Sequence, residues 1–208
     1  MNDSARLGMV AGILLILLIL IGTVSATVLV TISKDTSEED LNIIVGEIVD
    51  EMCNYLQIKH IVGKSQMIQG VPKINKIAIL IKPLVSQNID MSHMIIEVCD
   101  GEYYQMIFFN GLAESLNSSS LFEHPIWNSL TPVSFSLLST IDDDNSIVDL
   151  HLINKNTDMT LIVLKLSDNI AMKKGAQLEI TILPSPGIGR TIHVEAPLST
   201  KNIVTLYP

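Results

Sequence analysis

The chain begins with a run that constrains everything after it: residues 7–33 contain no charged side chain. At about 1.5 Å of rise per residue, a helix over this run would be near 40 Å long. That length is enough to cross the roughly 30 Å hydrocarbon layer of a membrane. The residues from Lys34 onward are polar enough to form a soluble domain of ordinary size. The sequence therefore predicts an apolar leading helix attached to a water-exposed head.

The apolar run has three interpretations. A cleaved secretory peptide has a shorter apolar region after a basic start, whereas only Arg6 precedes this one. A single membrane anchor fits the length. A helix buried against copies of itself is also consistent, because Gly8 and Gly12 have the four-residue spacing that lets helices approach closely. The residues expected in that polymerisation contact are Gly8, Gly12, Leu15, Leu18, Ile21, Gly22, Ala26 and Leu29.

Charge and cysteine content exclude several classes of protein. The formal net charge is −9, and Asp3 and Arg6 cancel in the leading segment, so the acidic excess follows Lys34. An acidic head argues against nucleic acid as a partner, since binding a phosphate backbone needs a basic face. Cys53 and Cys99 are too few for a disulfide framework, and their spacing matches no zinc motif. The two cysteines could form one disulfide bridge or remain two free thiols, and the sequence does not distinguish these alternatives.

A second helix is predicted directly after the apolar run. Thr36 and Glu39 form a capping box, and apolar residues then recur at three- and four-residue steps as far as Leu56. Since residues 33–37 contain no proline or glycine, the two segments are expected to form one nearly continuous helix. The predicted organisation is a short leader or tail at 1–6, a helix at 7–57 that includes the apolar run, and a head at 58–208.

From Ile58 the apolar period falls to two residues, which indicates strands. Asp100-Gly101 predicts a hairpin, and the turn residues around Gly187 predict another. Many short strands with turns about every ten residues predict an antiparallel, immunoglobulin-like β-sandwich, so that the fold class is α+β. The expected strands are 58–62, 73–81, 94–99, 103–110, 134–139, 148–153, 159–166, 177–183 and 191–196, with a short helix possible at 111–116.

The sequence gives little sign of catalysis, and we expect a protein that is not an enzyme. It has no nucleophile elbow, phosphate-binding loop or zinc-protease motif. Its five histidines are scattered singly, and Gly187-Ile188-Gly189 follows prolines and precedes a strand, which indicates a turn rather than a nucleotide site. No cofactor is expected apart from one candidate cation site.

Two candidate sites of binding or modification remain. The consecutive carboxylates Asp142, Asp143 and Asp144 offer hard oxygen ligands that suit Ca²⁺, although they lack the spacing of an EF-hand loop. An acidic turn between strands is the simpler interpretation. Asn117 begins an N-glycosylation sequon in a polar loop.

Three stretches of the chain resemble the archaellins, the archaeal flagellins. The first is the leading apolar run, followed by a helix and then an all-β head. The second includes INKIAI at 74–79, NIDMS at 88–92 and Asp100-Gly101. The third is the end of the chain, with KGAQLEITILP at 174–184, VEAP at 194–197 and the final LYP.

The resemblance implies a structural subunit of an extracellular filament, the archaellum, whose rotation drives swimming. Its implied partners are further copies of itself, paralogous archaellins, a membrane-embedded motor, an assembly platform and a prepilin-like peptidase. It also implies a chain that is inserted in the membrane before assembly. The family's leader is cut after a basic residue, which here points to the region of Arg6–Gly8, or else to an atypical leader.

Two other functions share the same layout. A type IV pilin-like adhesive filament has the same apolar segment, and only the head and a motility test separate it from an archaellum. A membrane-anchored β-sandwich that binds a ligand would keep the segment in lipid and would not form filaments.

Overall fold

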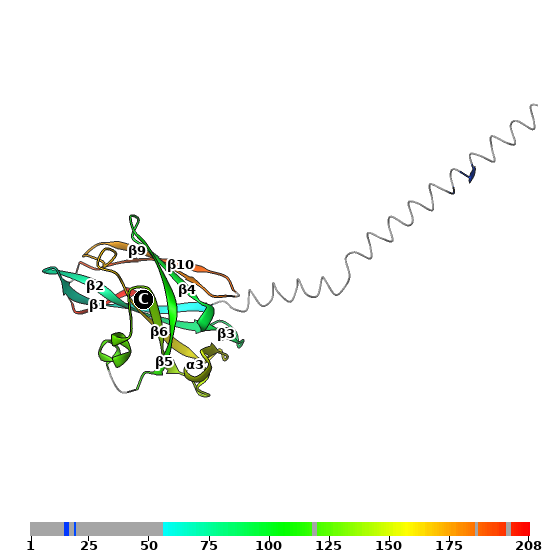
Figure 1. Cartoon of the computed structure of the whole chain (residues 1–208), viewed down its shortest axis with the longest axis horizontal. Coiled ribbons are helices and arrows are strands. Elements are labelled where there is room, and N and C mark those ends of the chain that lie inside the picture. The colour runs from blue at the N-terminus through cyan, green and yellow to red at the C-terminus, as the bar shows by residue number, and fades with distance from the viewer. Residues whose placement is uncertain (1–14, 17–18, 20–55, 118–119, 186, 199–200) are drawn as a thin grey trace, which may run out of the picture. The chain divides into compact units, whose positions relative to one another are not determined.

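The structure is a computed structural model that describes residues 15–16, 19, 56–117, 120–185, 187–198 and 201–208 (Figure 1). The chain divides into two units, residues 1–48 and residues 49–208. Within the described residues, no helix combines the length and the apolar character needed to cross a membrane.

The unit that ends at Pro208 consists mainly of strands. They are β1 (Leu56–Ile68), β2 (Val71–Pro83), β3 (Ile89–Asp90), β4 (Ile95–Cys99), β5 (Tyr104–Ser115), β6 (Ser134–Ile141), β7 (Leu152–Ile153), β8 (Met159–Lys165), β9 (Gln177–Leu183), β10 (Arg190–Glu195) and β11 (Ile203–Tyr207). Helical elements are short: the 3₁₀ turns η1 (Met91–His93), η2 (Leu121–Glu123) and η3 (Pro125–Asn128), and the α-helix α3 (Ser146–Leu150).

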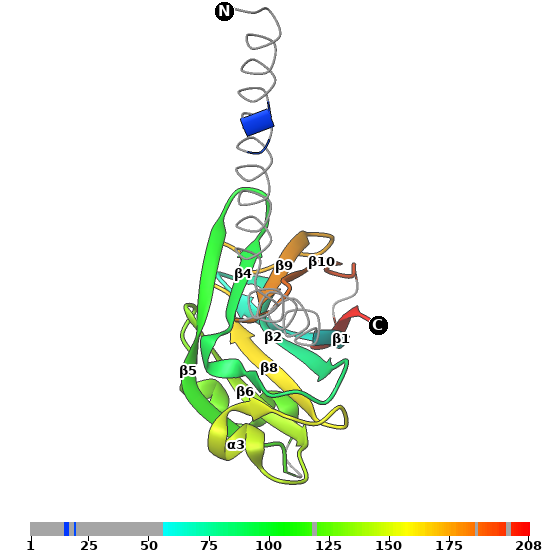
Figure 2. The ribbon, with the colours of Figure 1, turned by 90° about the vertical axis from the view of Figure 1, so that its right-hand side faces the viewer.

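Nine strands form a single sheet in the order β10-β9-β4-β5-β6-β8-β2-β1-β11, and β3 and β7 pair separately. All neighbours in the large sheet are antiparallel except β5 and β6, which are parallel. The two end strands, β10 and β11, contact each other, so the sheet curls into a nearly closed barrel (Figure 2). All nine strands contribute buried side chains to one core cluster, and the contribution of β5 is Ile107.

The predicted fold class, α+β with an antiparallel sandwich, is therefore wrong. Strand alternation predicts a buried and an exposed face, but a sandwich and a curled single sheet both satisfy that alternation. The described residues are mostly strand and include no long helix, since α-helical structure is limited there to α3 and to Leu15, Ile16 and Ile19. The helix predicted over 7–57 falls, apart from those three positions and the first residues of β1, outside the described residues.

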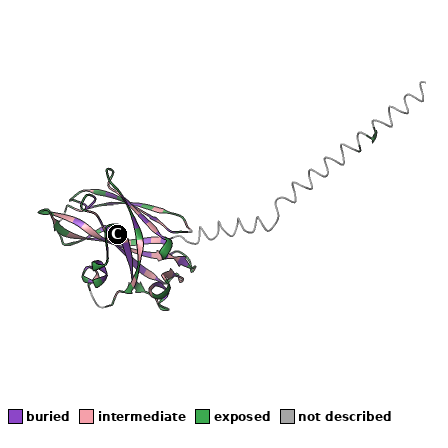
Figure 3. Ribbon diagram, in the orientation of Figure 1, coloured by how far each residue is buried: buried purple, intermediate pink, exposed green. Residues whose placement is uncertain are grey.

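The central strands are buried on both faces. On β2, Ile77 and Ile79 belong to the inner core, whereas Ala78 belongs to a second cluster on the outer face. The same alternation occurs on β8, where Ile162 faces inward and Val163 outward. The sequences of these two strands are therefore continuous apolar runs, as expected when both faces of a sheet are covered. Figure 3 shows how buried, half-buried and exposed residues are distributed over the strands.

The outer cluster is covered by the connection between β5 and β6. This segment carries η2 and η3, which bury Phe122 and Trp127 against β2, β6 and β8. The two rings stack at a centroid distance of 5.5 Å, and the Trp127 indole donates a hydrogen bond of 2.8 Å to the carbonyl of Leu121. A crossover of this kind is what allows β5 and β6 to lie parallel.

Most of the predicted strands are present, with four differences. Residues 148–153 are not a strand, because α3 occupies 146–150 and only β7 follows. Residues 111–116, expected as a possible helix, continue β5 beyond Gly111, whose φ is +81°. The final strand β11 was not predicted, and neither was the extension of β1 to Ile68, which pairs with Val71 across a turn with positive φ at Gln69 and Gly70.

Candidate assembly surfaces

Three residues of the apolar leading segment are described, and all three side chains are largely exposed. Leu15, Ile16 and Ile19 have helical backbone and exposed fractions of 64, 62 and 57% in the isolated chain. Large apolar side chains this exposed are favourably buried by lipid or by a partner. The other seven residues predicted for polymerisation, namely Gly8, Gly12, Leu18, Ile21, Gly22, Ala26 and Leu29, lie outside the described residues.

On the outer face of the barrel, three lysines stand in one cross-strand row. Lys64 on β1 pairs with Lys76 on β2, which in turn pairs with Lys165 on β8. We call these three residues the lysine row. Like charges placed directly opposite each other on neighbouring strands are destabilising. Among the described residues no ion pair links any of the three to a carboxylate.

The middle member of the lysine row is held in place by an aromatic ring. The Lys76 Nζ atom lies 5.0 Å from the centroid of Trp127, a cation–π distance. Partial burial, followed by the nearby charges of Lys165 and Lys64, lowers the pKa of Lys76 from its ordinary value. Lys165 donates a hydrogen bond of 3.0 Å to the carbonyl of Leu130. The lysine row therefore places three positive charges side by side, and contacts with the protein hold two of the three side chains in position.

A second surface, which we call the acidic face, carries carboxylates on β4, β9 and the turn after β4. Its members are Glu97, Asp100, Glu102 and Glu179. Glu97 alternates with the buried Ile96 and Val98 and so points outward. A groove of about 200 Å³ opens here, lined by Cys99, Asp100, Gly101, Gln177, Leu178, Glu179 and His193.

Apolar side chains lie next to the acidic face along β5. Tyr104, Met106 and Phe108 alternate with the buried Gln105 and Ile107 and have exposed fractions of 57, 41 and 48%. We call these three residues the β5 stripe. The Tyr104 hydroxyl donates a hydrogen bond to the Glu97 carboxylate, and this bond is the main reason why the pKa of Tyr104 is raised to about 12. The stripe and the acidic face are thus one continuous surface.

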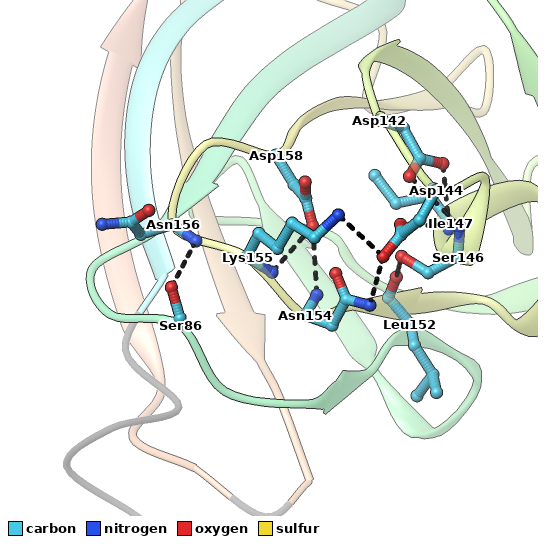
Figure 4. A network of polar contacts seen from close by, with 10 residues as sticks. All are labelled: Ser86, Asp142, Asp144, Ser146, Ile147, Leu152, Asn154, Lys155, Asn156 and Asp158. Atoms are coloured by element: carbon cyan, nitrogen blue, oxygen red, sulfur yellow. Dashed lines mark hydrogen bonds and ion pairs between the residues drawn. The ribbon is translucent and has the colours of Figure 1, made fainter.

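Two of the three predicted cation ligands, Asp142 and Asp144, lie in a network of polar contacts (Figure 4), and Asp143 between them is exposed. The Asp142 carboxylate accepts backbone hydrogen bonds from Ser146 (3.1 Å) and Ile147 (3.0 Å) at the start of α3. Asp144 accepts one of 2.9 Å from Asn154 and pairs with Lys155 at 3.0 Å. The bond from Asn154, followed by that from Lys155, lowers the pKa of Asp144 well below its usual range, whereas burial is the main cause of the raised pKa of Asp142.

Protein donors thus already engage carboxylate oxygens of Asp142 and Asp144. Across the described residues, no group of three or more His, Cys, Asp or Glu side chains converges as a metal ion requires. The Ca²⁺ site at Asp142, Asp143 and Asp144 stays a prediction. The network connects α3 to the loop before β8. In that loop, the buried Asp158 accepts backbone hydrogen bonds from Asn154 (3.1 Å) and Lys155 (2.9 Å).

One cluster has the residue types of a hydrolase but not their geometry. Asp90 accepts hydrogen bonds from the Ser92 hydroxyl and, at 2.9 Å, from the His93 ring. In a catalytic triad the histidine lies between the serine and the acid, so that it can take the serine's proton. Here the serine and the histidine share one carboxylate, which also caps η1 through the Ser92 amide. The arrangement stabilises a turn.

The remaining predicted residues are placed as follows. Asn117 is exposed, as a glycosylation site must be, and the next two residues of its sequon are outside the described set. Cys99 is half-buried. Cys53 is not among the described residues, so the pairing of the two cysteines stays open.

Known proteins resemble this chain at the level of a family and at the level of the fold. A family model described as archaeal-type flagellin matches residues 5–194. No curated protein matches the sequence at a significant level.

Two solved structures share the fold at low sequence identity. The crystal structure of archaeal flagellin FlaB1 from Methanocaldococcus jannaschii matches with a TM-score of 0.65 and 19% identity, covering 73% of this chain and 95% of that one. The archaeal flagellum of Methanospirillum hungatei strain JF1 matches with a TM-score of 0.55 and 10% identity, covering 96% and 99%. The family match extends over most of the sequence, and the chain therefore belongs to the archaeal-type flagellin family.

Proposed function

We propose that this chain polymerises by burying its apolar leading segment, residues 7–33, against the same segment of neighbouring copies. As an archaeal-type flagellin, the chain is a structural subunit of the archaellum, a cell-surface filament that drives motility. The observation that supports the proposed contact is the run of 27 uncharged residues beside an otherwise polar chain. The exposed side chains of Leu15, Ile16 and Ile19 agree with it.

The energy available to such a contact is large. If each segment buries on the order of 2,000 Å² of apolar surface, then at about 25 cal/mol per Å² the gain is tens of kcal/mol before entropy costs. The small residues Gly8, Gly12, Gly22 and Ala26 would permit close approach, and Leu15, Leu18, Ile21 and Leu29 would supply the apolar contact area. A contact related by a helical rotation does not close on itself, so it extends into a filament.

Before assembly, the same segment needs another apolar environment. We infer that it is inserted in the membrane, and that a prepilin-like peptidase cuts the chain near Arg6–Gly8 before the assembly platform adds it to the filament. The membrane-embedded motor and paralogous flagellins are its further inferred partners. We expect no catalytic activity of the filament subunit.

Shearing of cells tests the proposal directly. The sheared appendages are pelleted and imaged, and their subunits are identified by N-terminal sequencing. We expect the chain in the filament, with a new N-terminus close to Gly8 if the leader is cut there. Absence of the chain from the filaments, with release of single heads by detergent, would favour the membrane-anchored binding module. Filaments that support adhesion but not swimming would favour a pilin-like function.

Gly12→Asp tests the packing itself. A carboxylate among tightly packed apolar segments is costly to bury, so this variant is expected to reach the membrane but not the filament. Asn169→Asp is the matched control, because it adds the same charge at an exposed position of the head. Normal filaments from Gly12→Asp would contradict the proposed packing while leaving filament membership intact.

A further inference from the structure

The charges of the head are strongly segregated along the chain. Residues 56–83, which include β1 and β2, contain five lysines and no Asp or Glu. Residues 84–154 contain ten Asp and Glu and no Lys or Arg. The β1–β2 hairpin and the segment from β3 to β7, which fold against the same core, therefore carry opposite charge.

The sheet order places the two charged surfaces on different sides of the barrel. The lysine row lies on β1, β2 and β8, whereas the acidic face lies on β4 and β9, and β5 and β6 separate β4 from β8. The inner side chains of β2 and β4, such as Ile79 and Ile96, belong to one core cluster. Since their outer side chains point away from that core, the two surfaces face outward in different directions and do not neutralise each other within one head.

The lysine row is also costly to the isolated head. Lys64, Lys76 and Lys165 are directly paired across three strands, and no described carboxylate forms an ion pair with them. Repulsion of this kind is relieved when an acidic partner covers the row. The acidic groove beside Glu179, with Asp100 on its lining, offers room for lysine side chains.

We propose that, in the filament, the lysine row of one head contacts the acidic face and the β5 stripe of a neighbouring copy. This inference rests on the proposed function, because the filament is what brings copies together at high local concentration. Opposite charges on different sides of one subunit make a heterologous, head-to-tail contact, which suits a filament that does not close. The exposed Tyr104, Met106 and Phe108 would supply the apolar centre of the contact, with the charges around it.

Reciprocal charge reversal in the full-length chain tests this contact in cells that lack the wild-type copy. One variant is Lys64→Glu with Lys76→Glu, and the other is Glu97→Lys with Glu179→Lys. Each alone is expected to lower the mass of sheared filament per cell by about ten-fold, because like charges then face each other between copies. The combined four-residue variant restores attraction at every contact and is expected to return the yield to within about two-fold of wild type.

The matched control is Lys173→Glu with Lys174→Glu, which makes the same change in net charge at exposed positions outside the lysine row. This control is expected to assemble normally. Recovery in the four-residue variant also excludes misfolding as the cause of the losses, since a misfolded head is not rescued by more substitutions.

Three outcomes would overturn the inference. Normal yield from both two-residue variants, or a four-residue variant no better than either, would show that the surfaces do not meet. Loss only when the lysines are reversed would show that the row binds a different anionic partner. In each case wild-type filaments that contain the chain leave the proposed function standing, whereas wild-type filaments without it overturn both.

Discussion

Lys64 and Lys76 face each other directly across the β1–β2 hairpin, and Lys165 extends the pair onto β8. In an isolated head the direct pairing of these like charges is unfavourable, although Lys76 also contacts the Trp127 ring. The repulsion lowers the stability of the monomer, while an acidic neighbour turns it into an attraction. Stability of the isolated head and strength of assembly are therefore expected to change in opposite directions.

Lys64→Gln tests this trade-off. We expect it to raise the free energy of unfolding of the full-length chain in non-ionic detergent by about 0.5 kcal/mol at low ionic strength. The gain should shrink at 1 M salt, where the screening length is about 3 Å. Lys173→Gln, at an exposed position outside the row, should have no such effect. An unchanged or lower stability of Lys64→Gln would contradict the repulsion.

Gly63→Ala tests the packing between β1 and its neighbours. A Cβ atom at this position would lie 2.5 Å from Ile74 Cγ2 and 3.2 Å from Leu206 Cδ1. We expect the variant to lower the free energy of unfolding by about 1–3 kcal/mol, because the core has to shift to accept the methyl group. Chemical denaturation of the full-length chain in detergent measures the change.

A double variant identifies the cause of that loss. Ile74→Ala makes room for the added methyl group, so Gly63→Ala and Ile74→Ala together should cost less than the sum of the two. Strict additivity would show that the contact with Ile74 is not responsible. Thr205→Ala, exposed on β11, serves as a neutral control.

The sequence predicted the strands much better than their arrangement. The alternation of apolar and polar residues along 177–183 predicts both ends of β9 correctly, because this alternation reflects which side chains face a core. Pairing depends on contacts between distant segments, so nothing in the alternation indicated that β5 and β6 are parallel or that β10 approaches β11. The spacing of Val148, Leu150 and Leu152 mimics a strand, but Asp142 supplies hydrogen bonds that start α3 instead.

Of the candidate assembly surfaces, too, one could be predicted from the sequence and another could not. The apolar leading segment is evident from composition alone. The lysine row is not, because Lys64 and Lys165 are far apart in sequence and the register includes an irregularity between Lys64 and Ser65. The segregation of charge between residues 56–83 and 84–154 is a sequence signal that points toward the two surfaces, although only the sheet order shows where they lie.

Asp158→Ala tests the polar network below α3. The carboxylate is fully buried and accepts backbone hydrogen bonds from Asn154 and Lys155. Its loss leaves two amide groups without a partner, so we expect the free energy of unfolding to fall by about 2–4 kcal/mol. Asp149→Ala, which removes an exposed carboxylate on α3, should cost far less. Equal losses in the two variants would contradict a specific role for Asp158.

Tyr104 and Glu97 give a prediction about high pH. The hydrogen bond to Glu97 raises the pKa of Tyr104 to about 12 from an ordinary value of 10.0. Because the folded state binds the phenolic proton more tightly than the unfolded state, the stabilisation is complete below pH 10 and is lost as the pH rises toward 12. Tyrosine absorbance should therefore show one late transition, which Tyr104→Phe removes and Glu97→Gln moves toward 10. If Glu97→Gln left that transition at its original pH, the carboxylate would not be its cause, and the link between the β5 stripe and the acidic face would be lost.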